Sequence, residues 1–392
     1  MIPVTKAYLP NKDKYKAYVD RIYDTAWLTN NGTLLQELER RLKEHLGVKH
    51  LILVANGSLA LQLAYKALDL KGEVITTPFS FAATTSTLAW EGLKPVFADI
   101  HPTCFNLDPN NIEPLITEHT SAIVPVHVFG NPCQVEAIQA IADKHNLKVI
   151  YDAAHAFGTE YTDQHGHTQS VLNYGDISTI SFHATKLFHT IEGGAVITND
   201  DELARKIRLL INFGITGPTT IESVGTNAKM NEFEAAMGLC VLDEIDTIKT
   251  ERQRIWQTYQ QQLPGLVQFQ QWNPQSQNNH AYAPVLFKSE AQLLQAEAKL
   301  KEHNIIPRRY FYPSLDTLEY LKTDVIARSE VISNQNKRHC EERSDAAISS
   351  LQNRNNQACI ISRDIASRIL CLPIYPGLDF PDQLNVIKVI KE

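Results

Sequence analysis

The chain has 392 residues, of which 43% are hydrophobic, and its formal net charge is −7 at pH 7. This composition is typical of a folded protein with one large and one smaller domain, and it excludes a disordered chain. The negative net charge and the lack of a basic run on any predicted helix argue against a nucleic-acid or membrane partner. No segment has the roughly 20 apolar residues that are needed to span a bilayer.

The first half of the chain alternates between strand and helix patterns. Apolar, β-branched runs predict strands near 50–55, 73–77, 95–99, 121–128, 147–152, 177–182 and 194–198. Helical patterns lie between several of them, near 58–69, 80–91, 110–117 and 134–145. This alternation predicts an α/β fold with a mainly parallel, seven-stranded sheet covered by helices.

A long helical pattern runs from Asn231 into the 250s and is expected to connect two domains. We therefore predict a large cofactor-binding domain at residues 1–250 and a smaller α+β domain at residues 251–392. The smaller domain is predicted to contain a strand, a helix and a last apolar segment, at 281–287, 289–303 and 368–373. Between about 328 and 360 the composition becomes polar and charged, which predicts an inserted surface loop.

Cysteine and histidine spacing gives no indication of a metal centre or a disulfide framework. The six cysteines are scattered, and none of the fourteen histidines forms a ligand pair within a helical pattern. The N-terminus lacks a charged region followed by an apolar stretch, as a secretion signal would have. We therefore expect a cytoplasmic protein with reduced thiols and no metal.

Three chemically distinctive groups lie at the ends of predicted strands, where open α/β sheets bind ligands. Lys186 follows one strand and Asp152 closes another. Gly57 and Ser58 follow a third strand and open a helix, whose first N–H groups can hold a phosphate. Each group alone has an ordinary structural explanation, as a solvated lysine, a capping carboxylate or a serine N-cap. Together they are what pyridoxal phosphate requires: a Schiff-base lysine, a partner for the pyridine nitrogen and a phosphate cradle.

Six motifs stand in order along the chain, at 55–61, 78–84, 94–99, 152–158, 181–194 and 225–232. Together they resemble the sugar aminotransferases of the DegT/DnrJ/EryC1/StrS family. The resemblance implies the aspartate-aminotransferase type I fold and pyridoxal 5′-phosphate as the cofactor, with pyridoxamine phosphate as its intermediate form.

The resemblance also implies roles for single residues around the cofactor. Lys186 matches the lysine that carries the cofactor and moves the proton, and Asp152 matches the partner of the pyridine nitrogen. Phe81 matches the aromatic residue that stacks on the cofactor, and His155 matches a residue near the ring hydroxyl. The implied phosphate ligands are Gly57, Ser58 and Ser181.

Two further implications concern the partner subunit and the substrate. Asn227 matches an asparagine that reaches the cofactor phosphate of the neighbouring subunit, which implies a homodimer with shared active sites. The segment 307–313 resembles the substrate-side loop of the family, and arginine suits a diphosphate. The substrate-binding residues expected there are Arg308, Arg309 and Tyr310.

The reaction that the resemblance implies moves an amino group from L-glutamate to C4 of a nucleotide-linked 4-keto-6-deoxyhexose. The expected substrate is of the dTDP-4-keto-6-deoxyglucose type and the expected product is the 4-amino-4,6-dideoxyglucose derivative. Alternatives are a 3-keto sugar aminotransferase and the enzyme that makes the galactose epimer. A pyridoxamine-dependent dehydratase is disfavoured because such relatives replace the lysine, and a DNA-binding regulator is disfavoured by the net charge.

Overall fold

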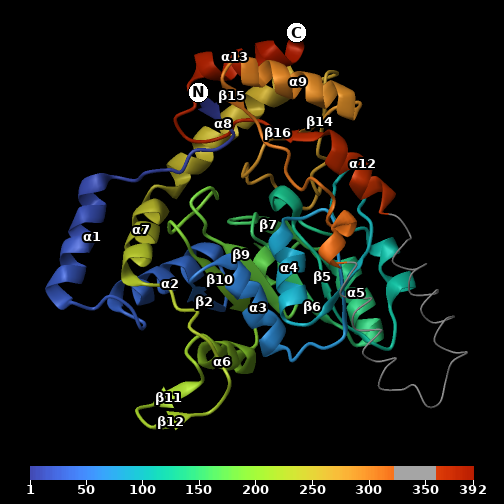
Figure 1. Cartoon of the computed structure of the whole chain (residues 1–392). Coiled ribbons are helices and arrows are strands. Elements are labelled where there is room, and N and C mark those ends of the chain that lie inside the picture. The colour runs from blue at the N-terminus through green and yellow to red at the C-terminus, as the bar shows by residue number, and fades with distance from the viewer. Residues whose placement is uncertain (322–358) are drawn as a thin grey trace, which may run out of the picture.

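In the computed structural model, which describes residues 1–321 and 359–392, a seven-stranded sheet forms the centre of the molecule (Figure 1). Its strands are β2 (His50–Val54), β3 (Glu73–Thr76), β4 (Lys94–Phe97), β5 (Thr120–Val124), β6 (Lys148–Asp152), β9 (Ile177–Ser181) and β10 (Gly194–Thr198). They lie in the order β2-β10-β9-β6-β5-β3-β4, and only β10 runs antiparallel to its neighbours. The prediction of a mainly parallel, seven-stranded sheet is confirmed.

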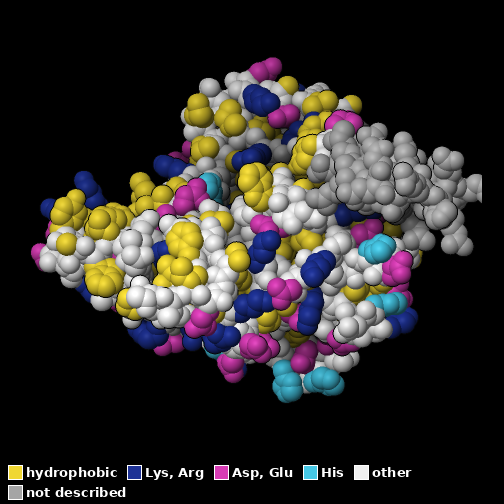
Figure 2. All heavy atoms as spheres, turned by 60° about the horizontal axis from the view of Figure 1, so that its bottom comes forward, with side chains coloured by type: hydrophobic (Ala, Val, Ile, Leu, Met, Phe, Trp, Pro, Cys, Tyr) yellow, Lys and Arg dark blue, Asp and Glu magenta, His cyan; other side chains and the backbone are white. Residues whose placement is uncertain are grey.

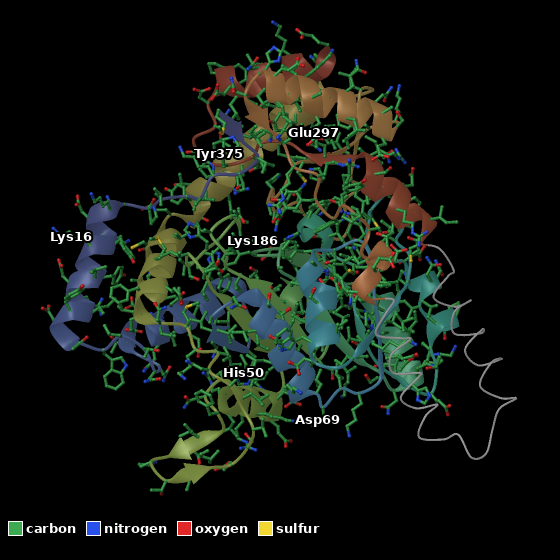
Figure 3. All side chains as sticks on the ribbon, in the orientation of Figure 1. Lys16, His50, Asp69, Lys186, Glu297 and Tyr375 are labelled. Carbon is green, nitrogen blue, oxygen red and sulfur yellow. The ribbon has the colours of Figure 1, made fainter. Side chains whose placement is uncertain are left out.

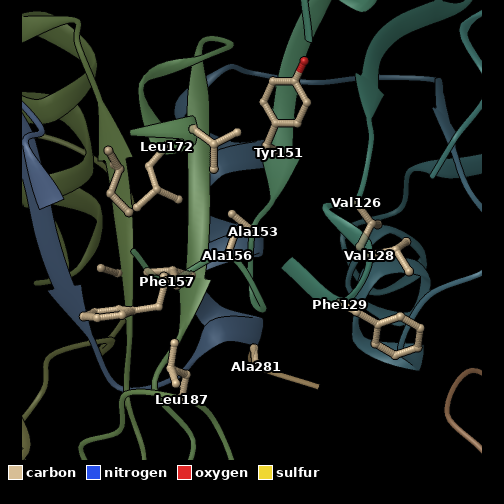
Figure 4. Packing of buried hydrophobic residues seen from close by; sticks show 14 of the residues in the cluster. Val126, Val128, Phe129, Tyr151, Ala153, Ala156, Phe157, Leu172, Leu187 and Ala281 are labelled. Carbon is tan, nitrogen blue, oxygen red and sulfur yellow. The ribbon is translucent and has the colours of Figure 1, made fainter. Parts of the chain in front are cut away.

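Helices cover both faces of this sheet because its strands bury side chains on both sides. Along β2, Ile52 and Val54 point into one core while Leu51 and Leu53 point into the other. The covering helices are α2 (Thr33–Leu46), α3 (Gly57–Ala67), α4 (Ala82–Trp90), α5 (Val135–His145) and α6 (Asp201–Leu210). Figure 4 shows part of the larger core, where Ala153, Ala156 and Phe157 pack near Leu187.

Two of the predicted helices differ from the structure. Residues 110–117 form two short 3-10 turns, η1 (Pro109–Asn111) and η2 (Glu113–Leu115), because Pro114 lacks the N–H that a continuous helix needs. The long helix is two helices, α7 (Glu232–Asp243) and α8 (Ile245–Gln262), and the backbone leaves helical values at Glu244. The carboxylate of Glu244 accepts hydrogen bonds from the Tyr8 hydroxyl and from Asn11 N, which anchors the break to the N-terminal segment.

The C-terminal part of the chain has its own three-stranded antiparallel sheet, with β13 (Gln268–Phe269), β14 (Pro284–Leu286) and β16 (Ile369–Cys371). Its helices are α9 (Glu290–Glu302), α12 (Ile360–Arg368) and α13 (Phe380–Lys391). A separate apolar core joins Ile2 to residues from α8 onward, and β1 (Ile2–Pro3) pairs with β15 (Ile305–Ile306). Both termini therefore lie at this end of the molecule (Figure 1). The boundary between residues 250 and 251 stays a prediction, and the predicted loop near 328–360 lies outside the described residues except at its last two positions.

The remaining elements are peripheral to the two sheets. They are α1 (Lys12–Thr25), the hairpin β7 (Glu160–Thr162) and β8 (Thr168–Ser170), the hairpin β11 (Ile215–Gly217) and β12 (Thr220–Ile221), and the 3-10 turns η3 (Val128–Gly130), η4 (Val171–Asn173) and η5 (Leu315–Thr317). The hairpin of β11 and β12 projects away from the body of the molecule, opposite the C-terminal sheet (Figure 1). Among the described residues, no helix is long and apolar enough to cross a membrane.

Candidate active site

A cavity of about 320 Å³ lies at the carboxyl ends of β6 and β9, against the beginnings of α3 and α4. This position follows from the parallel sheet, since polar residues that end neighbouring strands meet at one edge. Figure 3 shows Lys186 between the central sheet and the C-terminal part of the chain. The sequence-predicted residues that line the cavity are Gly57, Ser58, Phe81, Asp152, His155, Ser181, Lys186, Arg308 and Tyr310.

Lys186 belongs to the loop between β9 and β10. The loop is closed at its base by backbone hydrogen bonds from Phe182 N to Gly193 O and from Thr190 N to Phe182 O, at 2.8 and 2.9 Å. Burial lowers the pKa of Lys186 from 10.5 to about 8 because the ammonium form loses water, while the Asp152 carboxylate acts in the opposite direction. A lysine with this pKa is neutral in about one tenth of molecules at pH 7, far more than an ordinary lysine, and can act as a nucleophile or base.

Asp152 ends β6 with its carboxylate almost fully buried. One oxygen accepts a hydrogen bond from the Thr84 hydroxyl at 2.8 Å, and the other accepts from Ala154 N at 3.2 Å. Burial raises the pKa of Asp152, and these two hydrogen bonds and the Lys186 cation counteract part of that rise. The carboxylate is therefore held in one orientation at the cavity wall.

The beginning of α3 forms a cradle of backbone N–H groups beside the end of β9. The Asn56 side chain caps the helix by accepting a hydrogen bond from Leu59 N at 2.9 Å. A Cβ added at Gly57 would lie 2.9 Å from the Ser181 Cβ, so a glycine is needed where α3 meets β9. The N–H groups of the first turn have no acceptor within the helix, and together with the Ser58 and Ser181 hydroxyls they suit an anion.

His155 and Phe81 contribute rings to the cavity. His155 is buried, its Nδ1 has no hydrogen-bond partner in the described structure, and burial together with Lys186 lowers its pKa well below the usual value. The imidazole is therefore neutral. Phe81 is the N-cap of α4 and is 57% exposed, so one aromatic face is open to a ligand.

The two neighbouring arginines of the predicted substrate loop have different surroundings. Arg308 lines the cavity with its guanidinium 4.8 Å from the centre of the Tyr310 ring. Arg309 is absent from the cavity wall; its Nη2 donates to Glu290 at 2.8 Å, and its guanidinium lies 3.6 Å from the centre of the Tyr312 ring. Of the three predicted substrate residues, the structure brings Arg308 and Tyr310 to the site.

Asn227 lies outside the cavity of its own subunit. It is exposed and forms an isolated β-bridge with Asn212 at the base of the segment that carries the hairpin of β11 and β12. Its predicted role toward a partner subunit stays a prediction.

The sequence analysis assigned no role to two residues that contact the predicted catalytic pair. Thr84 lies three residues after Phe81 in the motif at 78–84, and this spacing of about one helical turn was a signal that could have placed its hydroxyl near the cavity. Tyr282, whose hydroxyl lies 3.3 Å from Lys186 Nζ, precedes β14 in the C-terminal part. It lies 96 positions from Lys186 in the chain, so no local pattern could have indicated this contact.

Comparison with known proteins shows which protein family the chain matches. The chain matches the model of the DegT/DnrJ/EryC1/StrS aminotransferase family over residues 11–342. It is 42% identical over 394 residues to a Shigella dysenteriae protein named dTDP-4-amino-4,6-dideoxy-D-glucose transaminase, covering 99% of this chain and 98% of that one. An Escherichia coli protein of the same name is 37% identical with the same coverage. The solved structure of DesI in the presence of its TDP-sugar product has a TM-score of 0.84 and 33% identity, covering 100% of this chain and 92% of DesI.

Proposed function

The chain belongs to the DegT/DnrJ/EryC1/StrS aminotransferase family, and we propose that it uses pyridoxal phosphate to transfer an amino group from L-glutamate to C4 of dTDP-4-keto-6-deoxyglucose. The products are 2-oxoglutarate and dTDP-4-amino-4,6-dideoxyglucose. The observation that carries the proposal is the meeting of Lys186, Asp152 and the first turn of α3 in one cavity. The identity with two transaminases named for this sugar supports the choice of substrate.

The residues present fit the proposed cofactor. The first turn of α3, with Ser58 and Ser181, would hold the phosphate, and Asp152 would meet the pyridine nitrogen. Phe81 would offer its exposed face to the ring. His155 has a buried Nδ1 without a partner in the described structure, so a polar group of a ligand would satisfy it.

When bound, pyridoxal phosphate supplies a ring that accepts the electron pair of a broken C–H bond. Lys186 removes the proton from the substrate carbon and returns one to a neighbouring atom, which its lowered pKa allows near neutral pH. With the cofactor bound, the Asp152 carboxylate would favour a proton on the pyridine nitrogen, because a buried negative charge stabilises a positive partner. Across both half-reactions the amine of glutamate replaces the keto oxygen of the sugar.

Arg308 is the proposed contact for the sugar diphosphate. Its guanidinium is exposed at the cavity and forms no salt bridge with a carboxylate in residues 1–321 and 359–392. A guanidinium without a carboxylate partner among these residues suits a phosphate, with which it can form two parallel hydrogen bonds.

We further propose a homodimer in which Asn227 completes the active site of the partner. An apolar groove lies between α3, α4 and residues 223–226, where Trp90 is 84% and Val224 is 85% exposed. Hydrophobic side chains are also exposed on the side of the molecule that carries α1 (Figure 2), among them Tyr23 and Trp27. Exposed apolar surface of this kind is typical of protein interfaces, and a second copy would cover it.

The proposal is tested by incubating the protein with pyridoxal phosphate, L-glutamate and a panel of dTDP- and UDP-linked 3-keto and 4-keto sugars, with Lys186→Ala as the control. Products are identified by NMR. We expect a 4-amino product with an equatorial amine, shown by large H3–H4 and H4–H5 couplings. An axial 4-amine, a 3-amino sugar or a dehydrated sugar would contradict the proposed substrate and stereochemistry.

A further inference from the structure

Tyr282 links the C-terminal part of the chain to the lysine of the candidate site. Its hydroxyl oxygen lies 3.3 Å from Lys186 Nζ, and the same nitrogen lies 5.9 Å from the centre of its ring. Over the described ranges, the amine of Lys186 has no other hydrogen-bond partner. The orientation of this amine therefore depends on the Tyr282 hydroxyl.

The ring of Tyr282 is fixed by close packing. Its centre lies 4.4 Å from that of His155, 5.2 Å from that of Tyr310 and 5.5 Å from that of Phe129. The ring is buried, and the next residue back in the chain is also tied down, because Ala281 O accepts a hydrogen bond from a guanidinium at 3.0 Å. The hydroxyl therefore has a fixed position from which to contact Lys186.

The donor of that bond, Arg252, adds a positive charge behind Tyr282. Arg252 is 3% exposed and has no carboxylate partner in the part of the chain that the structure describes. Burial nevertheless raises the pKa of Tyr282 well above its usual value, although Arg252 and Arg308 both act to lower it. The hydroxyl is therefore neutral at physiological pH.

A neutral hydroxyl can serve a lysine in both of its protonation states. It accepts a hydrogen bond from the ammonium form and donates one to the lone pair of the neutral amine. The charged groups that face Lys186 itself are Asp152 on β6 and Arg308 beside β16, and neither forms a hydrogen bond with it. Among residues 1–321 and 359–392, only the Tyr282 hydroxyl forms a hydrogen bond with this amine.

We propose that Tyr282 is a positioning residue, whose hydroxyl holds the free amine of Lys186 in one place whether that amine is charged or neutral. This inference rests on the proposed function, because that function makes the amine a reacting group. In each turnover the amine of Lys186 is freed and must then react again at the same position. A hydrogen bond that keeps the free amine in this position reduces the number of conformations from which it has to return. The hydroxyl also stabilises the ammonium form more than the neutral amine, because a hydrogen bond from a charged donor is stronger than one between neutral groups.

The test measures the reactivity of Lys186 in the full-length protein freed of cofactor. Wild type and Tyr282→Phe are treated with acetic anhydride over a range of pH, and the acetylation rate of the Lys186 peptide is followed by mass spectrometry. Only the neutral amine reacts, so the midpoint of the rate profile reports the amine pKa. We expect the midpoint to fall by about one pH unit in Tyr282→Phe, because the ammonium form loses its acceptor.

Tyr151→Phe is the matched control, because the buried Tyr151 hydroxyl has no hydrogen-bond partner in the described structure and Tyr151 does not line the cavity. Its midpoint should equal that of wild type. An unchanged midpoint in Tyr282→Phe, or an equal fall in both variants, would overturn the inference. Phenylalanine keeps the ring contacts, so the variant is expected to remain folded, which its thermal unfolding midpoint checks.

This measurement needs neither cofactor nor substrate, so its outcome is independent of whether the proposed transamination occurs. With the loaded enzyme and an accepted substrate, Tyr282→Phe should lower kcat about tenfold and leave KM for glutamate unchanged, as expected when an interaction of the reacting group is lost. A change in KM alone would instead indicate a substrate contact and contradict the positioning role.

Discussion

Replacing Asp152 with asparagine would remove the charge of this side chain while preserving its hydrogen bonds. The Thr84 hydroxyl, which donates to the carboxylate at 2.8 Å, also lies 2.7 Å from the Ser80 hydroxyl. It can therefore turn, donate to Ser80 and accept a hydrogen bond from the new amide nitrogen, while the amide oxygen accepts from Ala154 N. We expect the free energy of unfolding to change by less than about 1 kcal/mol.

The rate of transamination should fall much further, because a neutral amide cannot stabilise a positive charge on the nitrogen that it faces. Leaving one member of a buried charge pair without its partner costs about 3–5 kcal/mol. This corresponds to a loss of roughly 10²- to 5 × 10³-fold in turnover. The substitution should also lower the pKa of Lys186 below about 8, since the negative charge of Asp152 raises it.

The assay is the initial rate of 2-oxoglutarate formation from glutamate and dTDP-4-keto-6-deoxyglucose, both at saturation. Thr84→Val is the control, because it removes one hydrogen bond from the carboxylate and keeps the charge, and it should cost about tenfold or less. Cofactor binding, read from visible absorbance, should persist in both variants. If Asp152→Asn turns over within about threefold of wild type, which is well under 1 kcal/mol, the charge has no role in catalysis and the argument is wrong.

Four further predictions test the other parts of the site. Lys186→Ala should abolish turnover with an unchanged circular dichroism spectrum, and near-normal turnover would exclude this lysine. Mixing Lys186→Ala with Asn227→Ala subunits should restore activity, because one site of each hybrid dimer has both defects and the other has neither. If activity does not recover although subunit exchange is proven, the active sites are not shared. Arg308→Ala should raise KM for the nucleotide sugar at least about tenfold, as expected for the loss of a charged hydrogen bond. Arg309→Ala should leave this KM near wild type and lower the thermal stability. Equal effects of the two substitutions on KM would contradict the assignment of Arg308 to the sugar diphosphate. Uptake of pyridoxal phosphate by the cofactor-free protein should become faster with rising pH up to about 8. Only the neutral form of Lys186 is nucleophilic, and the pKa of Lys186 is lowered to about 8. A rate that keeps rising toward pH 10 would show that Lys186 has the pKa of an ordinary lysine.

Much of the large sheet could be predicted because each strand there is a short apolar run between turn residues. The chemistry at the strand ends was predictable for the same reason, since Asp152 closes one such run, Lys186 lies in the loop after another, and parallel strands bring their carboxyl ends to one edge. The break at Glu244 gave no comparable signal. Every residue of α7 from Ala235 to Leu242 is buried and α8 continues with buried Ile245 and Ile248, so the apolar pattern runs through Glu244. The carboxylate of Glu244 instead accepts a hydrogen bond from the distant Asn11 N, a contact that no local pattern indicates.

The different positions of Arg308 and Arg309 could not be derived from composition either. The segment is extended there, with Arg308 in a β-bridge to Cys371, and side chains alternate between the two faces of extended backbone. One guanidinium therefore points into the cavity, while the next is directed to Glu290. Which of two adjacent arginines reaches a ligand depends on strand register, and register depends on the partner strand rather than on the arginines themselves.

The candidate site divides its tasks between the two parts of the chain. The ends of β6 and β9 and the first turn of α3 provide the groups assigned to the cofactor, whereas the segments around β14 and 308–311 provide those assigned to the lysine amine and the sugar. The two sets are joined by directional contacts, since the Asn279 side chain donates to His155 O at 2.8 Å and Tyr282 reaches Lys186. A change at Arg308 can therefore alter the sugar that is accepted without moving the groups that hold the cofactor, whereas Tyr310 and Phe311 pack against Tyr282 and His155. A change at Asn279 or Tyr282, by contrast, would disturb both tasks at once, because these residues fix the position of one set relative to the other.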